Sequence, residues 1–167
     1  MSGVLSRFWR VLSVAALAIS LSLLGGCGGT PTFRDSGRPV GPDRRAVIGT
    51  AVAAVGAPYR YGGASPAAGF DCSGLAYYAH SRADRPIPRQ SGQQYRKASR
   101  TAPDELTPGD LLFFDTGSSD GHVGVYLGKG NFIHAPSTGG RVRTDSVYDD
   151  YWGKRFVGAG HFYEGDG

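Results

Sequence analysis

The order of its sequence patterns predicts that this chain has an α+β fold with an antiparallel sheet. Helical patterns occupy the first half of the chain, and apolar runs separated by short glycine-rich turns occupy the second half. Helices and strands that are segregated in this way are typical of α+β domains, whereas regular alternation would indicate a parallel sheet. Residues 43–167 have the size of one ordinary domain and contain no internal repeat, so we expect one folded domain.

Residues 1–26 have the features of a secretory signal peptide. Arg7 and Arg10 give the segment a positive start, and small and apolar residues run unbroken from Val11 to Leu24. That run is shorter than the roughly 20 apolar residues that a comfortable membrane span needs. The chain is therefore predicted to be exported.

The stretch Leu24-Gly25-Gly26-Cys27 resembles a bacterial lipobox. By that resemblance Cys27 carries lipid, including palmitate, and begins a mature lipoprotein in the cell envelope. The non-acidic Gly28 favours the outer membrane, facing the periplasm. A stray cysteine behind an ordinary signal peptide is the alternative. Residues 27–42 are rich in Gly, Pro, Thr and Ser without an apolar period, which predicts a flexible tether.

The mature chain is only weakly basic. The whole sequence has 18 Lys and Arg against 14 Asp and Glu, and loss of Arg7 and Arg10 leaves 16 against 14, a net charge of +2. That excess is too small for the clustered basic surface that nucleic acids require. The four histidines also lack the short spacings of zinc sites. We therefore expect no nucleic-acid partner, no metal and no cofactor.

Three helices are expected before the strands. Asp43 is the predicted N-cap of the first, which Gly56 and Pro58 end. The second begins at Cys72, and Ser91 caps a short third helix. Strands are predicted over Leu111–Phe114, His122–Leu127, Asn131–Ala135, Gly140–Thr144 and Arg155–Phe162.

Cys72 lies where a tight loop ends and an apolar helix begins. The first turn of a helix presents free N–H groups and a positive dipole end, which favour thiolate over thiol. Asp71 and Ser73 are candidate caps for this helix. If Cys27 carries lipid, Cys72 stays a free thiol in an exported protein, which favours a chemical role. A small buried core cysteine is the alternative.

A cysteine nucleophile needs a base, and the base needs an orienting group. His122 and His134 fall on adjacent predicted strands. If the loop is Gly128–Gly130, Leu127 faces Asn131 and both histidines share one face, a diagonal step of about 7 to 8 Å apart. A two-residue loop would place them on opposite faces. Two unrelated strand histidines are the alternative.

Six stretches, taken in order, resemble the NlpC-type cell-wall cysteine peptidases. They are Tyr59-Arg60-Tyr61-Gly62-Gly63, Phe70-Asp71-Cys72-Ser73-Gly74-Leu75, Pro88-Arg89, Pro108-Gly109-Asp110-Leu111, His122-Val123-Gly124-Val125-Tyr126-Leu127-Gly128 and Phe132-Ile133-His134-Ala135. The resemblance implies a papain-like α+β domain, with the nucleophile at the N-terminus of a helix packed on an antiparallel sheet.

By the same resemblance Cys72 is the nucleophile, His122 the base and His134 the orienting group. Tyr59, with Asp71 and Ser73, belongs to the oxyanion and substrate-binding region. The implied activity is that of a murein endopeptidase that cuts stem peptides or cross-links of peptidoglycan, with membrane attachment through Cys27. An acyltransferase or amidase on the same scaffold, and a non-catalytic cell-wall binding module, are the alternatives. The bond that is cut, the choice of membrane and any activating partner stay open.

Overall fold

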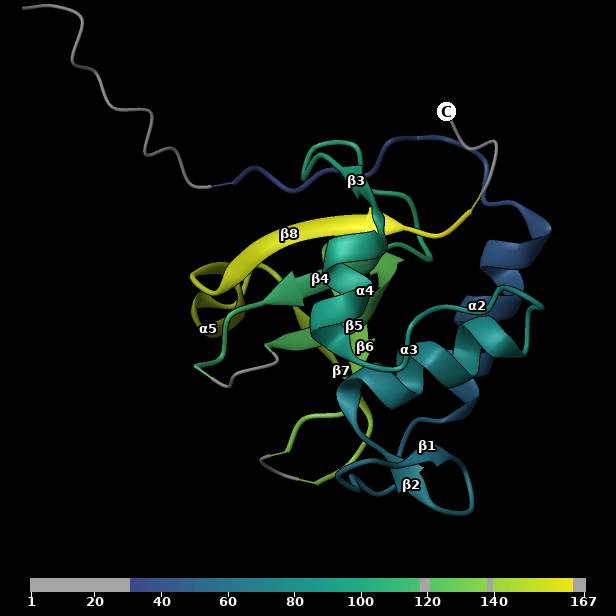
Figure 1. Cartoon of the computed structure of the whole chain (residues 1–167). Helices are drawn as coiled ribbons and strands as arrows, with labels where there is room; N and C mark the ends of the chain where they lie inside the picture. Colours follow the sequence, from purple (N-terminus) through teal and green to yellow (C-terminus); the bar gives the residue numbers. More distant parts are fainter. Residues whose placement is uncertain (1–30, 118–120, 138–139, 164–167) are drawn as a thin grey trace, which may run out of the picture. The chain divides into compact units, whose positions relative to one another are not determined.

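The computed structural model describes residues 31–117, 121–137 and 140–163 (Figure 1). Its centre is a six-stranded antiparallel sheet with the order β3-β8-β4-β5-β6-β7. The predicted α+β class and antiparallel sheet are confirmed. The expected signal peptide, Cys27 and the first residues of the expected tether lie outside the described residues. The strands of this sheet are β3 (Ser99–Thr101), β4 (Leu111–Phe114), β5 (His122–Gly128), β6 (Asn131–His134), β7 (Arg143–Ser146) and β8 (Phe156–His161).

The helices are α2 (Pro42–Ala53), α3 (Cys72–Ser81), α4 (Ser91–Lys97) and α5 (Asp150–Gly153). Figure 1 shows α2 and α3 side by side, next to the two-stranded sheet of β1 (Ala64–Ser65) and β2 (Gly69–Phe70). No helix in the described ranges has the length and apolar character needed to cross a membrane.

Two predicted helix caps are wrong by one or two residues. Helix α2 begins at Pro42 with Gly41 as its N-cap, because proline fits the first turn, where its missing N–H is not needed. Asp43 lies inside that turn and forms an ion pair with Arg85 at 2.7 Å. Helix α4 has Gln90 as its N-cap instead of Ser91, which is the first helical residue.

Both faces of the sheet are covered by apolar side chains. Leu111, Phe113 and Val125 belong to a cluster that includes residues of α2 and α3. Leu112 and Phe114, which alternate with them along β4, belong to a second cluster on the opposite face. Burial on both faces explains why β4 is apolar at every position.

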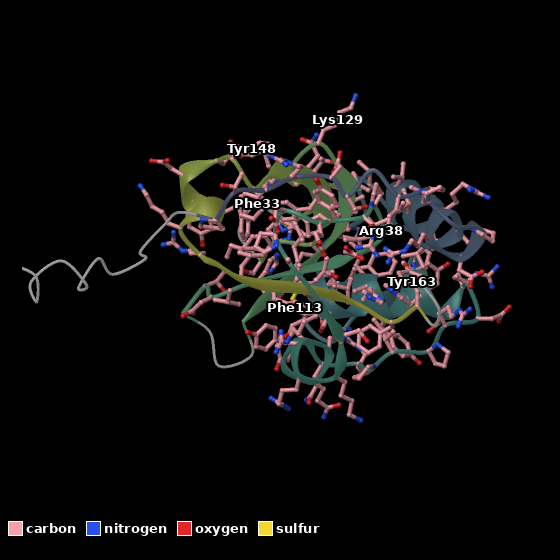
Figure 2. All side chains as sticks on the ribbon, turned by 90° about the horizontal axis from the view of Figure 1, so that it is seen from above. Phe33, Arg38, Phe113, Lys129, Tyr148 and Tyr163 are labelled. Atoms are coloured by element: carbon pink, nitrogen blue, oxygen red, sulfur yellow. The ribbon has the colours of Figure 1, made fainter. Side chains whose placement is uncertain are left out.

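The second face is covered partly by the segment before α2. Phe33 is 9% exposed and meets Tyr148 edge to face at 6.1 Å (Figure 2). The Arg34 N–H donates to the Pro103 carbonyl, and the Arg34 carbonyl accepts the Leu106 N–H. The Asp35 carboxylate accepts a hydrogen bond from the Tyr126 hydroxyl. Within the tether predicted over residues 27–42, the part from Phe33 to Ser36 is therefore held against the domain and is not a free linker.

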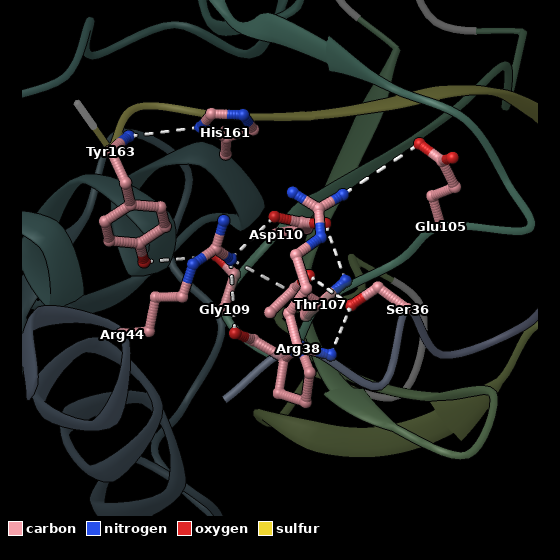
Figure 3. Close-up of polar contacts among 10 residues, drawn as sticks. Ser36, Arg38, Arg44, Glu105, Thr107, Gly109, Asp110, His161 and Tyr163 are labelled. Carbon is pink, nitrogen blue, oxygen red and sulfur yellow. Dashed lines mark hydrogen bonds and ion pairs between the residues drawn. The ribbon is translucent and has the colours of Figure 1, made fainter. Parts of the chain in front are cut away.

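A buried polar cluster fixes the turn that leads into β4 (Figure 3). Arg44 on α2 pairs with Asp110 at 2.7 Å, and both side chains are almost fully buried. The Asp110 carboxylate also accepts the Thr107 N–H, and the Tyr163 hydroxyl donates to the Gly109 carbonyl. A buried pair of this kind is weak evidence for stability, but here it joins α2 directly to the turn before β4.

The β5–β6 hairpin sets the relation between the two strand histidines. Val125 pairs with Ile133 and Tyr126 with Phe132, which is the predicted register. The register then shifts, so that Gly128 instead of Leu127 faces Asn131. The turn residues 128–130 all have positive φ, which glycine adopts readily and which produces the local bulge.

The remaining predicted strands are present with shifted ends. Strand β7 begins three residues later than expected and continues to Ser146, and β6 ends at His134. The short elements β1, β2, β3 and α5 were not predicted. Each has at most four residues, too few to show a period in the sequence.

Candidate active site

A surface cleft joins the N-terminus of α3 to the start of β5. Five predicted site residues line it, namely Tyr59, Asp71, Cys72, Ser73 and His122. The sixth, His134, is fully buried behind His122. The structure therefore brings together all six residues that the sequence singled out in this domain.

Asp71 organises the N-terminus of α3. Its carboxylate accepts the Gly74 N–H at 2.6 Å, the Ser73 hydroxyl at 3.1 Å and the Gly62 N–H at 2.9 Å. The Arg89 guanidinium donates to both carboxylate oxygens, at 2.9 and 2.8 Å. Burial acts to raise the pKa of Asp71, but the hydrogen bonds from Arg89 and Gly74 outweigh it and hold the pKa below its ordinary value. Asp71 is thus an anionic cap whose oxygens are already engaged.

The Cys72 thiol is free and partly exposed in the cleft. Burial raises its pKa, and the N–H groups of Val123, Ser73 and Cys72 itself, which point at the sulfur, offset only part of that rise. The N–H groups at the helix N-terminus favour the thiolate, as expected, but desolvation of the anion outweighs them. The thiol needs a base to become a nucleophile.

His122 can supply that base. The Val123 N–H beside the Cys72 sulfur brings the start of β5 next to the thiol. Burial, followed by the charges of His134 and Arg143, lowers the pKa of His122 to about 3, although Asp145 acts to raise it. The imidazole is therefore neutral at pH 7 and can accept a proton.

His122 and His134 are joined directly. The His122 Nε2 atom lies 2.7 Å from the His134 Nδ1 atom, and the rings are nearly perpendicular, at 88°. The predicted shared face is confirmed, and the alternative of unrelated histidines is wrong. Burial also lowers the pKa of His134, to about 4, so one N–H is shared by two neutral rings.

Two residues that the sequence did not single out, Asp145 and Trp152, contact the two histidines. Asp145 on β7 accepts hydrogen bonds from His134 Nε2 and Trp152 Nε1, each at 3.0 Å. The Trp152 indole stacks on the His122 ring, with centroids 5.2 Å apart and planes 28° apart. The predicted fourth strand ended at Thr144, one residue before Asp145. Extending it beside the His134 strand would have placed Asp145 near His134.

Arg89 was quoted within a motif but was given no role. It ties Asp71 to the Gly63 carbonyl, which it reaches at 3.1 Å. A side chain at Gly74 would collide with that same carbonyl at 2.0 Å, so only glycine lets the loop approach α3 this closely. Arg89 and Gly74 together fix the loop that carries Tyr59.

Tyr59 lines the same cleft as the nucleophile. Its N–H donates to the Gly140 carbonyl at 2.6 Å, and its backbone bridges to Phe70. Burial raises the pKa of its hydroxyl, and the neighbouring Cys72 raises it further. The hydroxyl therefore stays protonated and can donate a hydrogen bond beside the sulfur.

The described ranges contain no group of three or more His, Cys, Asp or Glu side chains placed to hold a metal ion. The cleft contains the Cys72 thiol, the neutral His122 imidazole and several N–H and O–H donors. These are the components of nucleophilic catalysis at an acyl carbon.

Comparison with known proteins agrees with this arrangement. Residues 56–161 match the family model described as NlpC/P60 family. Over 111 residues the chain is 48% identical to the murein DD-endopeptidase MepH of Escherichia coli, a match that covers 63% of this chain and 41% of MepH.

Two solved structures extend the comparison. The peptidoglycan hydrolase RipB of Mycobacterium tuberculosis superposes with a TM-score of 0.64 and 32% identity, over 73% of this chain and 65% of RipB. RipD of the same organism, described as a non-catalytic NlpC/p60 domain protein adapted to peptidoglycan binding, gives 0.59 and 26%, over 71% of this chain and 95% of that one. The chain thus spans less than half of MepH and under two thirds of RipB.

Proposed function

Because this chain belongs to the NlpC/P60 family, as its motifs predicted, we propose that it is a cysteine endopeptidase acting on the stem peptides or cross-links of peptidoglycan. The observation that carries this proposal is the placement of Cys72 and His122 in one cleft, with His134 bonded behind His122. The names of MepH and RipB, a murein DD-endopeptidase and a peptidoglycan hydrolase, support the substrate class.

The protonation states of the two groups favour a general-base mechanism. Neutral His122 takes the thiol proton as the Cys72 sulfur attacks the carbonyl carbon of the scissile amide. The C–N bond then breaks, and His122 returns the proton to the leaving amine. Water, deprotonated by His122, hydrolyses the resulting thioester and restores the thiol.

The oxyanion of each tetrahedral intermediate needs hydrogen-bond donors near the sulfur. The N–H of Cys72 points toward its own sulfur, and the Tyr59 hydroxyl is a protonated donor in the same cleft. We assign these two groups to the oxyanion site. Donors fixed in advance within a desolvated cleft contribute strongly to such catalysis.

The charges along the cleft suit a peptide that carries charged groups. Asp71 and Arg89 lie beside α3, and Arg143 lines the cleft beside α5. We assign Asp71, Ser73 and Arg89 to the substrate-binding wall. Since Asp71 is already engaged by four groups, its part is to hold that wall in place while Ser73 and Arg89 face the peptide.

Attachment to the membrane is proposed from the sequence alone. The lipobox-like stretch supports cleavage after residue 26, lipidation of Cys27 and a location in the outer membrane facing the periplasm. A lipoprotein there would meet peptidoglycan directly, which agrees with the proposed substrate.

Digestion of purified muropeptides tests the activity. The protein is incubated with cross-linked and uncross-linked muropeptides, with Cys72→Ala as the control, and products are read by mass spectrometry. We expect fragments that have gained water, from the wild type alone. In a parallel digestion with a free amine added, products joined to that amine would indicate acyl transfer. Equal product from both proteins, or none from the wild type, would reject the cysteine endopeptidase.

A further inference from the structure

Three polar side chains form a diagonal row across β5, β6 and β7. The β5–β6 register places His134 two positions from the partner of His122. The β6–β7 register pairs His134 with Arg143 and Phe132 with Asp145, so Asp145 is again two positions away. Residues two apart on a strand share a face, so His122, His134 and Asp145 lie on one face of the sheet.

Asp145 accepts hydrogen bonds from three neighbours. Its Oδ2 atom lies 3.0 Å from His134 Nε2, from Trp152 Nε1 and from Arg143 Nη2, and Oδ1 lies 3.0 Å from Arg143 Nε. Burial acts to raise the pKa of Asp145, but Arg143 and its other partners outweigh it, so the group is ionised at neutral pH. A carboxylate can only accept, so the His134 nitrogen facing it must carry the hydrogen.

The position of that hydrogen determines the tautomer of the next ring. A neutral imidazole carries one N–H, so His134 with its hydrogen on Nε2 presents a lone pair at Nδ1. His122 Nε2, 2.7 Å away, must then donate. The other nitrogen of His122, Nδ1, is left with the lone pair that a base needs. We propose that Asp145 is a positioning residue that sets this order of tautomers through His134, which rests on the proposed function of the cleft.

Arg143 has a necessary part in this arrangement. An unscreened carboxylate would favour a protonated His134, which would donate from both nitrogens and turn His122 Nε2 into an acceptor. The hydrogen on His122 would then sit on Nδ1 and block the base. Arg143 faces the same carboxylate, and its positive charge opposes protonation of His134. The pair Asp145–Arg143 therefore selects a tautomer without charging the ring.

Asp145→Leu tests the role because leucine has a similar size but offers no acceptor to His134 Nε2. Beside the positive charge of Arg143, a lone pair at Nε2 is then favoured over an N–H, which would reverse both tautomers. We expect kcat on muropeptides to fall by about 10² to 10⁴ with KM little changed, the range for loss of a positioned base. Asp150→Leu is the matched control, because its exposed carboxylate pairs with Lys154, just after the same short helix, and its loss of charge should leave kcat unchanged.

Nitrogen-15 NMR of labelled histidines reads the tautomers without any turnover. In the full chain carrying Cys72→Ala, we expect His134 and His122 both protonated at Nε2 at pH 7. Adding Asp145→Leu should move the His122 proton to Nδ1. A His134 protonated at Nδ1 while Asp145 is present would overturn the assignment, and so would an unchanged spectrum and kcat in Asp145→Leu.

The two measurements separate this role from the activity itself. A protein with the expected tautomers that cleaves no muropeptide would reject the endopeptidase and leave the order set by Asp145 intact. A protein that cleaves muropeptides with the opposite tautomers would reject Asp145 as a positioning residue alone. If Asp145→Leu does not fold, which its melting curve would show, the spectrum of the Cys72→Ala chain still tests the assignment.

Discussion

The imidazoles of His122 and His134 meet at 2.7 Å between Nε2 and Nδ1, with their planes nearly at right angles. A single N–H therefore fills the space between them and fixes the plane of the His122 ring. Because His122 also stacks on Trp152, the ring is held by a hydrogen bond at one edge and by packing on one face.

His134→Ala should remove the hydrogen bond and leave His122 free to turn. We expect turnover to fall by about 10² to 10⁴, in the range of a positioned general base, with little change in substrate affinity. His134→Asn should keep more activity, because its amide oxygen can still accept the His122 N–H. Single-turnover acylation of Cys72 measures all three proteins. Equal rates in the wild type and His134→Ala would remove His134 from the site.

Cys72→Ser should reduce muropeptide cleavage by roughly a thousandfold or more, the scale of deleting a nucleophile. A hydroxyl ionises far less readily than a thiol, and the burial that already raises the pKa of Cys72 would penalise an alkoxide as well. The melting temperature is the control and should stay close to that of the wild type. Turnover in Cys72→Ser close to that of the wild type would reject Cys72 as the nucleophile.

The parts of the site that were predicted correctly depend on local pattern. The place of Cys72 at a helix N-terminus follows from a loop and an apolar helix that are adjacent in sequence. The shared face of His122 and His134 follows from one hairpin whose glycine-rich turn sets the register. Both features are decided within a few residues of the functional group.

The parts that were missed depend on contacts distant in sequence. Asp145 reaches His134 only because a third strand pairs with β6, and Phe33 is buried because it packs against Tyr148 and Phe156 on the far face of the sheet. The ionisation of Cys72 depends on such contacts as well. The helix terminus is visible in the sequence, whereas the desolvation that outweighs it comes from the assembled fold.

Phe33→Ala should destabilise the domain although it lies in the segment that the sequence assigned to a tether. The side chain is buried against Tyr148 and Phe156, and loss of a buried phenylalanine costs about 3 to 5 kcal/mol. Urea unfolding measures the loss. Arg34→Ala is the matched control, because its exposed side chain leaves the backbone bonds of this segment intact. A free energy of unfolding unchanged in Phe33→Ala would show that the segment does not stabilise the domain.

Cys27→Ala should release the protein from the membrane fraction. Without the thiol, no lipid can be attached at the predicted lipobox. Mass spectrometry of the wild type should find a mature chain that begins at a lipidated Cys27. A mature N-terminus elsewhere, or a wild type that fractionates without lipid, would mean that this cysteine is incidental.

His80 makes a separate prediction about acid stability. Its ring is fully buried on α3, its Nδ1 lies 2.9 Å from the Ala76 carbonyl oxygen, and its Nε2 has no hydrogen-bond partner among the described residues. Burial lowers its pKa to about 4 from an ordinary 6.5. The unfolded chain therefore binds this proton more readily than the folded protein does.

The sign of the effect follows from that difference. The contribution of neutral His80 to stability is complete above pH 6.5 and is lost as the pH falls through 4, amounting to about 3 kcal/mol. His80→Met removes the titrating group and fills similar space. Urea unfolding at pH 7 and pH 4.5 should show a loss of stability on acidification that is smaller in His80→Met by about 2 to 3 kcal/mol. Since His122 and His134 titrate in both proteins, the difference between the two losses belongs to His80. Identical losses would mean that acid does not act through this ring.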